Sequence, residues 1–215
     1  MAGSQSVPAH QFDDLTQEHE AASIGMWLFL ATEVLFFGGL ILGYAVYRST
    51  YPEAFQEGSR HLDLLLGSIN TAVLITSSLT MALAVHSAQE GRSRALVVFL
   101  LLTMVIGMVF LGIKGTEYVH KYHESLVPGL RFDYHGPQAG QVELFLLLYF
   151  LMTALHALHL TVGIGILGVL ALLAWRGHFS ADYYAPVETS GLYWHFVDIV
   201  WIFLLPLLYL IGAHQ

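Results

Sequence analysis

The chain has 215 residues, and only 8 Lys and Arg and 16 Asp and Glu are charged, while 56% of the residues are hydrophobic. A soluble domain carries about 25% charged residues, against 11% here, so the composition argues against a soluble globular enzyme. The net charge of -8 excludes nucleic-acid binding, which requires a basic surface. Because Cys is absent, a metal would have to be held by His or carboxylates.

The apolar pattern predicts an all-α fold, a polytopic membrane helix bundle with five transmembrane helices. A bilayer core of about 30 Å needs about 20 apolar residues per helix, and five such runs alternate with short polar stretches. We assign residues 24–213 to one domain. The fourth run has no formal charge and no Pro, so we expect one long helix there. The runs cover residues 24–47, 64–86, 95–113, 144–175 and 191–213.

Residues 1–23 form an acidic, amphiphilic N-terminal tail in the sequence. The tail contains Asp13, Asp14, Glu18 and Glu20 but no Lys or Arg. A secretory signal needs a positive region before its apolar stretch, so we expect the first helix to be retained as a membrane anchor.

Aromatic and basic residues bear on the orientation in the membrane. Trp27, Trp175 and Trp194 lie at the start, end and start of the first, fourth and fifth runs, which predicts an aromatic belt on one membrane face. That face carries three Arg residues, against five Lys and Arg residues on the other. The positive-inside rule applied to this count favours an external amino terminus.

Small residues at four-residue spacing predict close helix packing. They recur along the second run, and the first run repeats the spacing. Such residues let a neighbouring helix approach closely, and we expect ordinary bundle packing from them. The residues are Gly39 and Gly43 in the first run and Ser68, Ala72, Thr76, Thr80, Ala84 and Ala88 in the second.

Glu33 is the charge that is hardest to place in a membrane. It lies nine residues into the first run, which is about 14 Å along a helix and near the bilayer centre. An acidic residue there costs about 2.5 to 3.5 kcal/mol, so Glu33 must be protonated, paired or facing a polar cavity. Three interpretations remain open: a hydrogen bond between helices, a role in proton handling, and a lipid contact.

His156 and His159 share one face of the fourth run. Two imidazoles three residues apart could bind one metal, but such a site needs further ligands from other helices. They are also too close together to serve two stacked haems. Hydrogen bonding between helices or to lipid headgroups is the favoured interpretation. The other ionisable residues inside the runs are Glu33, His86, His195 and Asp198.

His195 and Asp198 lie three residues apart in the fifth run. A carboxylate one turn from an imidazole can neutralise it and so reduce the cost of burying both, which predicts a structural pair. The chain contains no phosphate-binding loop, nucleophile elbow or Cys/His couple, so no self-contained catalytic apparatus is visible.

Six segments, taken in chain order, resemble subunit III of haem-copper oxidases. Longer members of that family have seven helices, and this chain resembles the five-helix bacterial form that lacks the first two. The segments are IGMWLFLATEVLFF at 24–37, NTAVL at 70–74, HSAQEG at 86–91, GTEY at 115–118, HALH at 156–159 and YWHFVDIVW at 193–201.

The resemblance implies a subunit without a catalytic centre and without haem or copper of its own. It implies direct packing against subunit I, assembly with subunit II, haem and copper in those partner subunits, and support of proton uptake. It places the chain in the bacterial cytoplasmic (inner) membrane, with the amino terminus cytoplasmic and the carboxyl terminus periplasmic. We follow this orientation over the charge count, because short loops with few Lys and Arg decide little.

The resemblance also implies roles for single residues. Glu33 matches the intramembrane glutamate known in the family for its reaction with carbodiimide. The matching histidines line a cleft that holds structural phospholipid, and without the first two helices the far wall of that cleft is absent. Lipid or interhelical contacts are expected for His86, Glu117, His156, His159, His195 and Asp198.

Two alternatives and one choice remain open. An accessory protein of nitric oxide reductase looks similar to this family. A small proton-coupled transporter built around Glu33, His156 and Asp198 is the competitor from another class, although an internal repeat or broken helices would be expected of it. The electron donor of the oxidase, cytochrome c or quinol, is not determined by the sequence.

Overall fold

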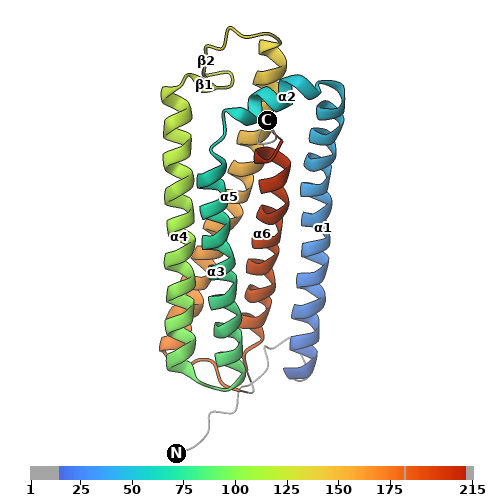
Figure 1. Ribbon diagram of the computed structural model, residues 1–215. Coiled ribbons are helices and arrows are strands. Elements are labelled where there is room, and N and C mark those ends of the chain that lie inside the picture. The colour runs from blue at the N-terminus through green and yellow to red at the C-terminus, as the bar shows by residue number, and fades with distance from the viewer. Residues whose placement is uncertain (1–14, 182, 212–215) are drawn as a thin grey trace, which may run out of the picture.

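The computed structural model describes residues 15–181 and 183–211, so Asp13 and Asp14 of the acidic tail lie outside the described residues. Within these described residues, five helices are long and apolar enough to cross a membrane (Figure 1). At one end of the bundle, the connections between them contain a short helix and a hairpin of two strands with two residues each. The elements are α1 (Leu15–Thr50), α2 (Pro52–Arg60), α3 (Leu64–Gln89), α4 (Ser93–His123), β1 (Leu126–Val127), β2 (Arg131–Phe132), α5 (Ala139–Trp175) and α6 (Ala185–Tyr209).

The helices extend beyond the apolar runs at several ends. α1 begins at Leu15, so residues 15–23 of the predicted tail belong to the helix. α4 continues past residue 113 to His123, because Lys114 and Glu117 pair with each other inside the bundle and do not interrupt it. α5 is a single helix, and α6 begins at Ala185 and ends at Tyr209.

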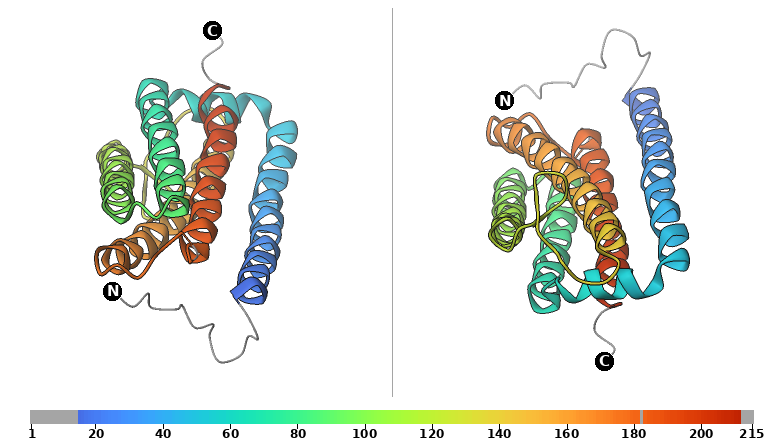
Figure 2. Two further views of the ribbon diagram at one scale, coloured as in Figure 1. Left: turned by 90° about the horizontal axis from the view of Figure 1, so that it is seen from below. Right: turned by 90° about the horizontal axis from the view of Figure 1, so that it is seen from above.

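Four helices, α3 to α6, pack together, and α1 stands beside them (Figure 2). In the most apolar stretch of α1 11% of the residues are buried, against 50% in α6, so α6 is central and α1 is loosely attached. The largest fully buried side chains include Trp194, Trp201, Tyr149 and Phe145. Most other apolar side chains on the outer faces are exposed, as expected of helices that face lipid or other subunits.

α2 crosses one end of the bundle and is held by its apolar face. Pro52 opens the helix at a position where its missing N–H costs nothing. The ring of Phe55 packs edge to face against Tyr44 and Phe145, with centroids 5.3 and 5.4 Å away. Ser59 Oγ donates to the carbonyl oxygen of Leu208 at 2.7 Å. These contacts hold α2, which follows α1 in the chain, against α5 and α6.

Gly58 of α2 packs directly against the ring of Phe145 on α5. A Cβ atom at this position would collide with the ring of Phe145, which is completely buried. We expect Gly58→Ala to lower the free energy of unfolding by about 1 to 3 kcal/mol, as overpacking of a tight site does. Thermal unfolding in detergent, followed by circular dichroism, measures the loss. Gly38→Ala is the matched control, because its Cβ would meet nothing within 4 Å, and an equal loss in both variants would contradict the prediction.

Only some of the small residues at four-residue spacing pack against other helices of this chain. Residues four apart in a helix are rotated by about 40° beyond a full turn, so a four-residue ladder drifts across faces. A Cβ at Gly39 or Gly43 would meet nothing within 4 Å, so these glycines mediate no close helix contact among the described residues. In α3 the residues Ser68, Ala72 and Thr76 are exposed, whereas Thr80, Ala84 and Ala88 are buried.

The predicted aromatic belt also needs a correction. Trp27 and Trp175 are exposed, but Trp194 is fully buried. Its indole nitrogen donates to Ser77 Oγ at 3.1 Å, which satisfies its polar edge inside the bundle. Because α6 begins at Ala185, Trp194 lies more than two turns inside the helix rather than at its start. It is therefore a core residue.

Candidate functional site

Glu33 of α1 and His159 of α5 meet within the membrane-spanning region. His159 Nε2 lies 3.1 Å from Glu33 Oε2, and His159 Nδ1 lies 2.8 Å from the carbonyl oxygen of Leu155. Because a carbonyl oxygen only accepts, Nδ1 carries a hydrogen. Nε2 of a neutral ring then accepts from a protonated Glu33, whereas a charged ring donates to an ionised Glu33. The pair is neutral as a whole in both forms, which suits its depth.

The pair borders an apolar cavity of about 420 Å³ between α1, α5 and α6. Tyr193 on α6 donates its hydroxyl to the carbonyl oxygen of His159 at 2.9 Å and lies on the cavity wall. Both Glu33 and His159 are 18% exposed, so the carboxyl is within reach of a hydrophobic molecule that enters from the lipid. The remaining lining is mainly apolar and includes Met26, Phe29, Leu158, Val162 and Ile166.

We expect a hydrophobic carbodiimide to label Glu33. The reagent reacts with a protonated carboxyl, and one form of the pair with His159 places the proton on Glu33. Peptide mass spectrometry locates the label. Glu33→Gln keeps the shape of the side chain, so the variant should fold and lose the label. Labelling confined to the acidic N-terminal tail would contradict the prediction.

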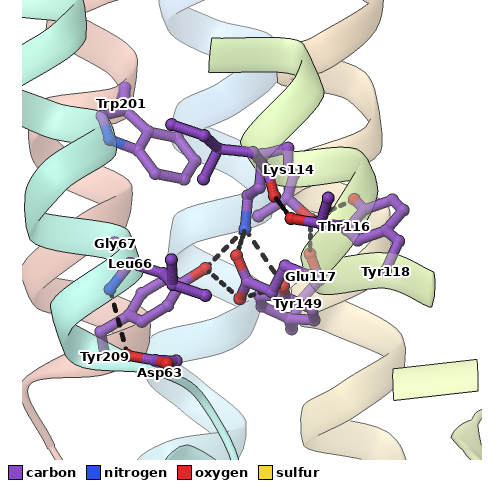
Figure 3. Close-up of polar contacts among 12 residues, drawn as sticks. Asp63, Leu66, Gly67, Lys114, Thr116, Glu117, Tyr118, Tyr149, Trp201 and Tyr209 are labelled. Carbon is purple, nitrogen blue, oxygen red and sulfur yellow. Dashed lines mark hydrogen bonds and ion pairs between the residues drawn. The ribbon is translucent and has the colours of Figure 1, made fainter. Parts of the chain in front are cut away.

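Lys114 and Glu117 form a second polar site, buried between α4, α5 and α6 (Figure 3). Lys114 Nζ donates to Glu117 Oε2 at 2.9 Å and to the hydroxyl of Tyr149 at 3.1 Å. The hydroxyls of Tyr149 and Tyr209 each donate to Glu117 Oε1 at 2.7 Å. Lys114 is 4% exposed and Glu117 is 2% exposed, so the ion pair is removed from both lipid and water.

Aromatic rings surround the ammonium group of this ion pair. Lys114 Nζ lies 4.9 to 5.2 Å from the ring centres of Tyr149, Trp201 and Tyr209, which adds cation–π attraction. The predicted apolar run ends at residue 113, just before Lys114, and it does not indicate the pair with Glu117. The three-residue spacing of a Lys and a Glu beside an apolar run was the signal that could have identified the pair.

His156 lies apart from His159 and is completely enclosed. Its ring packs against Phe110 and Trp201, with centroids 5.5 and 5.2 Å away. Its Nε2 has no hydrogen-bond partner among the described residues. The two histidines therefore make separate contacts, one in the core and one at the Glu33 cavity. Within residues 15–181 and 183–211, no group of three or more His, Asp or Glu is placed to hold a metal.

His195 and Asp198 do not form the predicted pair. His195 Nδ1 shares a hydrogen bond of 2.8 Å with Ser78 Oγ on α3, because the imidazole extends across the helix interface rather than along α6. Both carboxyl oxygens of Asp198 are buried and have no hydrogen-bond partner in the described part of the chain. The Ser78 hydroxyl also lies near this carboxyl, but the hydrogen bond that it makes within the usual distance is the one with His195.

The remaining predicted residue, His86, lies at the end of α3. Its Nε2 is 3.5 Å from Glu90 Oε2, an exposed carboxylate oxygen that also pairs with Arg92. At the opposite end of the bundle, Lys121 Nζ donates to Glu124 Oε2 at 2.6 Å. Partial burial alone would raise the pKa of Glu124, but this bond and the positive charge of Lys121 lower it below the usual value. The charges at the His86 end are exposed, whereas Lys121 is only 4% exposed beside a Glu124 that is 37% exposed.

Comparison with known proteins gives a consistent result. Residues 13–125 and 135–213 match the family model of cytochrome c oxidase subunit III. A cytochrome c oxidase subunit 3 from Synechocystis sp. is 36% identical over 191 residues, which cover 87% of this chain and 74% of the relative. A quinol oxidase subunit 3 from Bacillus spizizenii is 30% identical over 88% of this chain and 86% of its own length. A cytochrome c oxidase subunit 3 from Thermostichus vulcanus is 32% identical over 92% of each.

Proposed function

Because the chain belongs to the cytochrome c oxidase subunit III family, we propose that it supports the oxygen reduction of a haem-copper terminal oxidase without performing it. The observation that carries this proposal is the extent of the family match. The match runs through all five membrane-spanning helices, and between residues 13 and 213 it omits only residues 126–134, which contain the β1–β2 hairpin. Relatives that use cytochrome c and relatives that use quinol are both similar to the chain, so the fold serves either donor.

The proposed role is to stabilise the catalytic subunit I by helix packing, while subunits I and II hold haem and copper. The contacts of the buried polar groups support this assignment of structural and catalytic roles to different subunits. Lys114 and Glu117 of α4 bond to the hydroxyls of Tyr149 on α5 and Tyr209 on α6, and Glu33 of α1 contacts His159 of α5, so these groups already link helices. Exposed apolar side chains on α3 and α6 supply surface for packing against other subunits or lipid.

We assign a second role, support of proton uptake, to the neighbourhood of Glu33 and His159. A carboxyl and an imidazole in contact can exchange one proton without a net charge in the membrane. The apolar cavity beside them fits the acyl chain of a structural phospholipid. The chain would span the bacterial cytoplasmic membrane with a cytoplasmic amino terminus and a periplasmic carboxyl terminus.

Purification of the tagged chain in a mild detergent tests the proposal. The optical spectrum of the purified complex should show the bands of a haem-copper oxidase, and the complex should consume oxygen. Separately expressed chain should contain no stoichiometric copper or iron on metal analysis. A complex that reduces nitric oxide instead of oxygen would support the accessory-protein alternative, and a chain that purifies alone and carries a solute would support the transporter.

A further inference from the structure

A groove of about 410 Å³ runs between α3 and α6 on the outer side of the bundle. The two helices lie side by side at the front of Figure 1, and no other membrane-spanning helix of residues 15–181 and 183–211 covers them there. Exposed apolar side chains form the walls of the groove. Ala82 also lines the groove, and its small side chain does not narrow it. The wall residues are Ile75 and Leu79 on α3, and Ile199 and Ile202 on α6, which are 47% to 60% exposed.

The inner side of the groove is polar, unlike its walls. Ser78, His195 and Asp198 line it together. His195 uses Nδ1 for Ser78, and no partner of its other ring nitrogen is found in the described part of the chain. Asp198 is 4% exposed, and its two oxygens have no hydrogen-bond partner among the residues described. The groove thus ends on polar groups whose hydrogen-bonding capacity is incompletely used. At the two polar sites described above, by contrast, Glu33 pairs with His159 and Lys114 pairs with Glu117.

The depth of these groups restricts what can satisfy them. Asp198 lies 13 residues from the start of α6 and 11 from its end, which is about 20 and 17 Å along the helix. The polar headgroups begin about 15 Å from the bilayer centre, so they do not reach this position. Acyl chains reach it but carry no donor or acceptor. A hydrogen-bonding side chain on another membrane-spanning helix reaches this depth in a membrane.

We propose that the α3–α6 groove receives a transmembrane helix of another subunit of the oxidase, which places a hydrogen-bond donor side chain against His195 and Asp198. This inference rests on the proposed function, because it requires an oxidase complex. The apolar walls supply packing area, and the small side chain of Ala82 permits close approach of the helix. The donor completes the hydrogen bonding of the polar groups in a medium that offers no water to replace it.

Photocrosslinking in the assembled complex tests which molecule occupies the groove. A photoreactive phenylalanine analogue is placed at Leu79 or at Ile202 on the groove walls, and at Val105 on the outer face of α4 as the matched apolar control. After irradiation in native membranes, the complex is purified through a tag on this chain, and the crosslinked peptides are sequenced. We expect both groove positions to join one transmembrane segment of another oxidase subunit, in higher yield than the control.

A second measurement addresses the polar groups. His195→Ala and Asp198→Leu should lower retention of the chain in the detergent-solubilised complex by about threefold to tenfold, the range of a hydrogen bond between membrane helices. Thr161→Val is the control, because Thr161 is exposed and bonds only to Ala157 of its own helix, at 2.8 Å. The level of each variant in the membrane reports its folding. The crosslinks need no polar substitution and remain informative if His195→Ala misfolds.

Crosslinks from both groove positions to lipid alone, or to a second copy of this chain, would overturn the proposal. Unchanged retention of His195→Ala and Asp198→Leu would overturn the role of the polar groups. Failure of the proposed function is distinguishable, because the unmodified tagged chain would then purify without any haem-copper subunit.

Discussion

An oxidase complex stripped of this chain should begin turnover near its normal rate at low pH, slow as the pH rises, and inactivate irreversibly over many turnovers. The initial rate should persist because haem and copper are held by other subunits in the proposed complex. The decline with pH should follow because protons become scarce, and the proton entrance of the catalytic subunit would have lost the wall that this chain provides. The inactivation should follow from exposure of a helix interface that is normally covered.

Oxygen consumption across a pH series, measured with an electrode on complexes of equal haem content, checks this prediction. The control is the same stripped complex after it is reconstituted with the purified chain, which should regain both the rate at high pH and the lifetime. Loss of oxygen reduction from the first turnover, with haem content unchanged, would contradict the supporting role and indicate a direct catalytic one.

The membrane-spanning helices could be predicted because apolar length is a strong constraint. Five runs of the required length correspond to the five long helices. The helix ends could not be predicted from apolarity alone. Lys114 and Glu117 interrupt the apolar pattern of α4, yet they neutralise each other in the bundle, and the helix continues to His123. The short helix α2 was missed because its few apolar residues pack only against the assembled bundle.

The contacts of the buried polar residues, like the helices, could be predicted only in part. The depth of Glu33 marked it as a residue that needs a partner, but its contact with His159, 126 residues away in the sequence, depends on how α1 and α5 are rotated. His195 and Asp198 share a helix face, as their spacing predicts, but a shared face does not specify a contact. Ser78 from α3 provides the bond instead. Spacing within one helix therefore predicted which face is polar, and packing between helices determined the pairs.

Lys114→Met should destabilise the chain by about 3 to 5 kcal/mol, because it leaves the buried Glu117 carboxylate without its counter-charge. Both tyrosine hydroxyls donate to Oε1 of Glu117 and carry no opposite charge, so the substitution also removes the hydrogen bond that Lys114 makes to Oε2. Glu117→Gln should produce a comparable loss by leaving the Lys114 ammonium unpaired within its aromatic cage. Thermal unfolding in detergent and the level of the chain in the membrane provide the two measurements.

The double variant Lys114→Met/Glu117→Gln should recover most of the stability that either single variant loses. With both charges removed, no charge remains buried, and the amide oxygen at position 117 still accepts from the two tyrosine hydroxyls. The control is Glu57→Gln, which breaks a Glu57–Arg60 pair of the same three-residue spacing, 44% and 38% exposed at Arg60 and Glu57. That loss should stay below about 1 kcal/mol. If Lys114→Met cost no more than Glu57→Gln, the buried pair would not stabilise the junction of α4, α5 and α6.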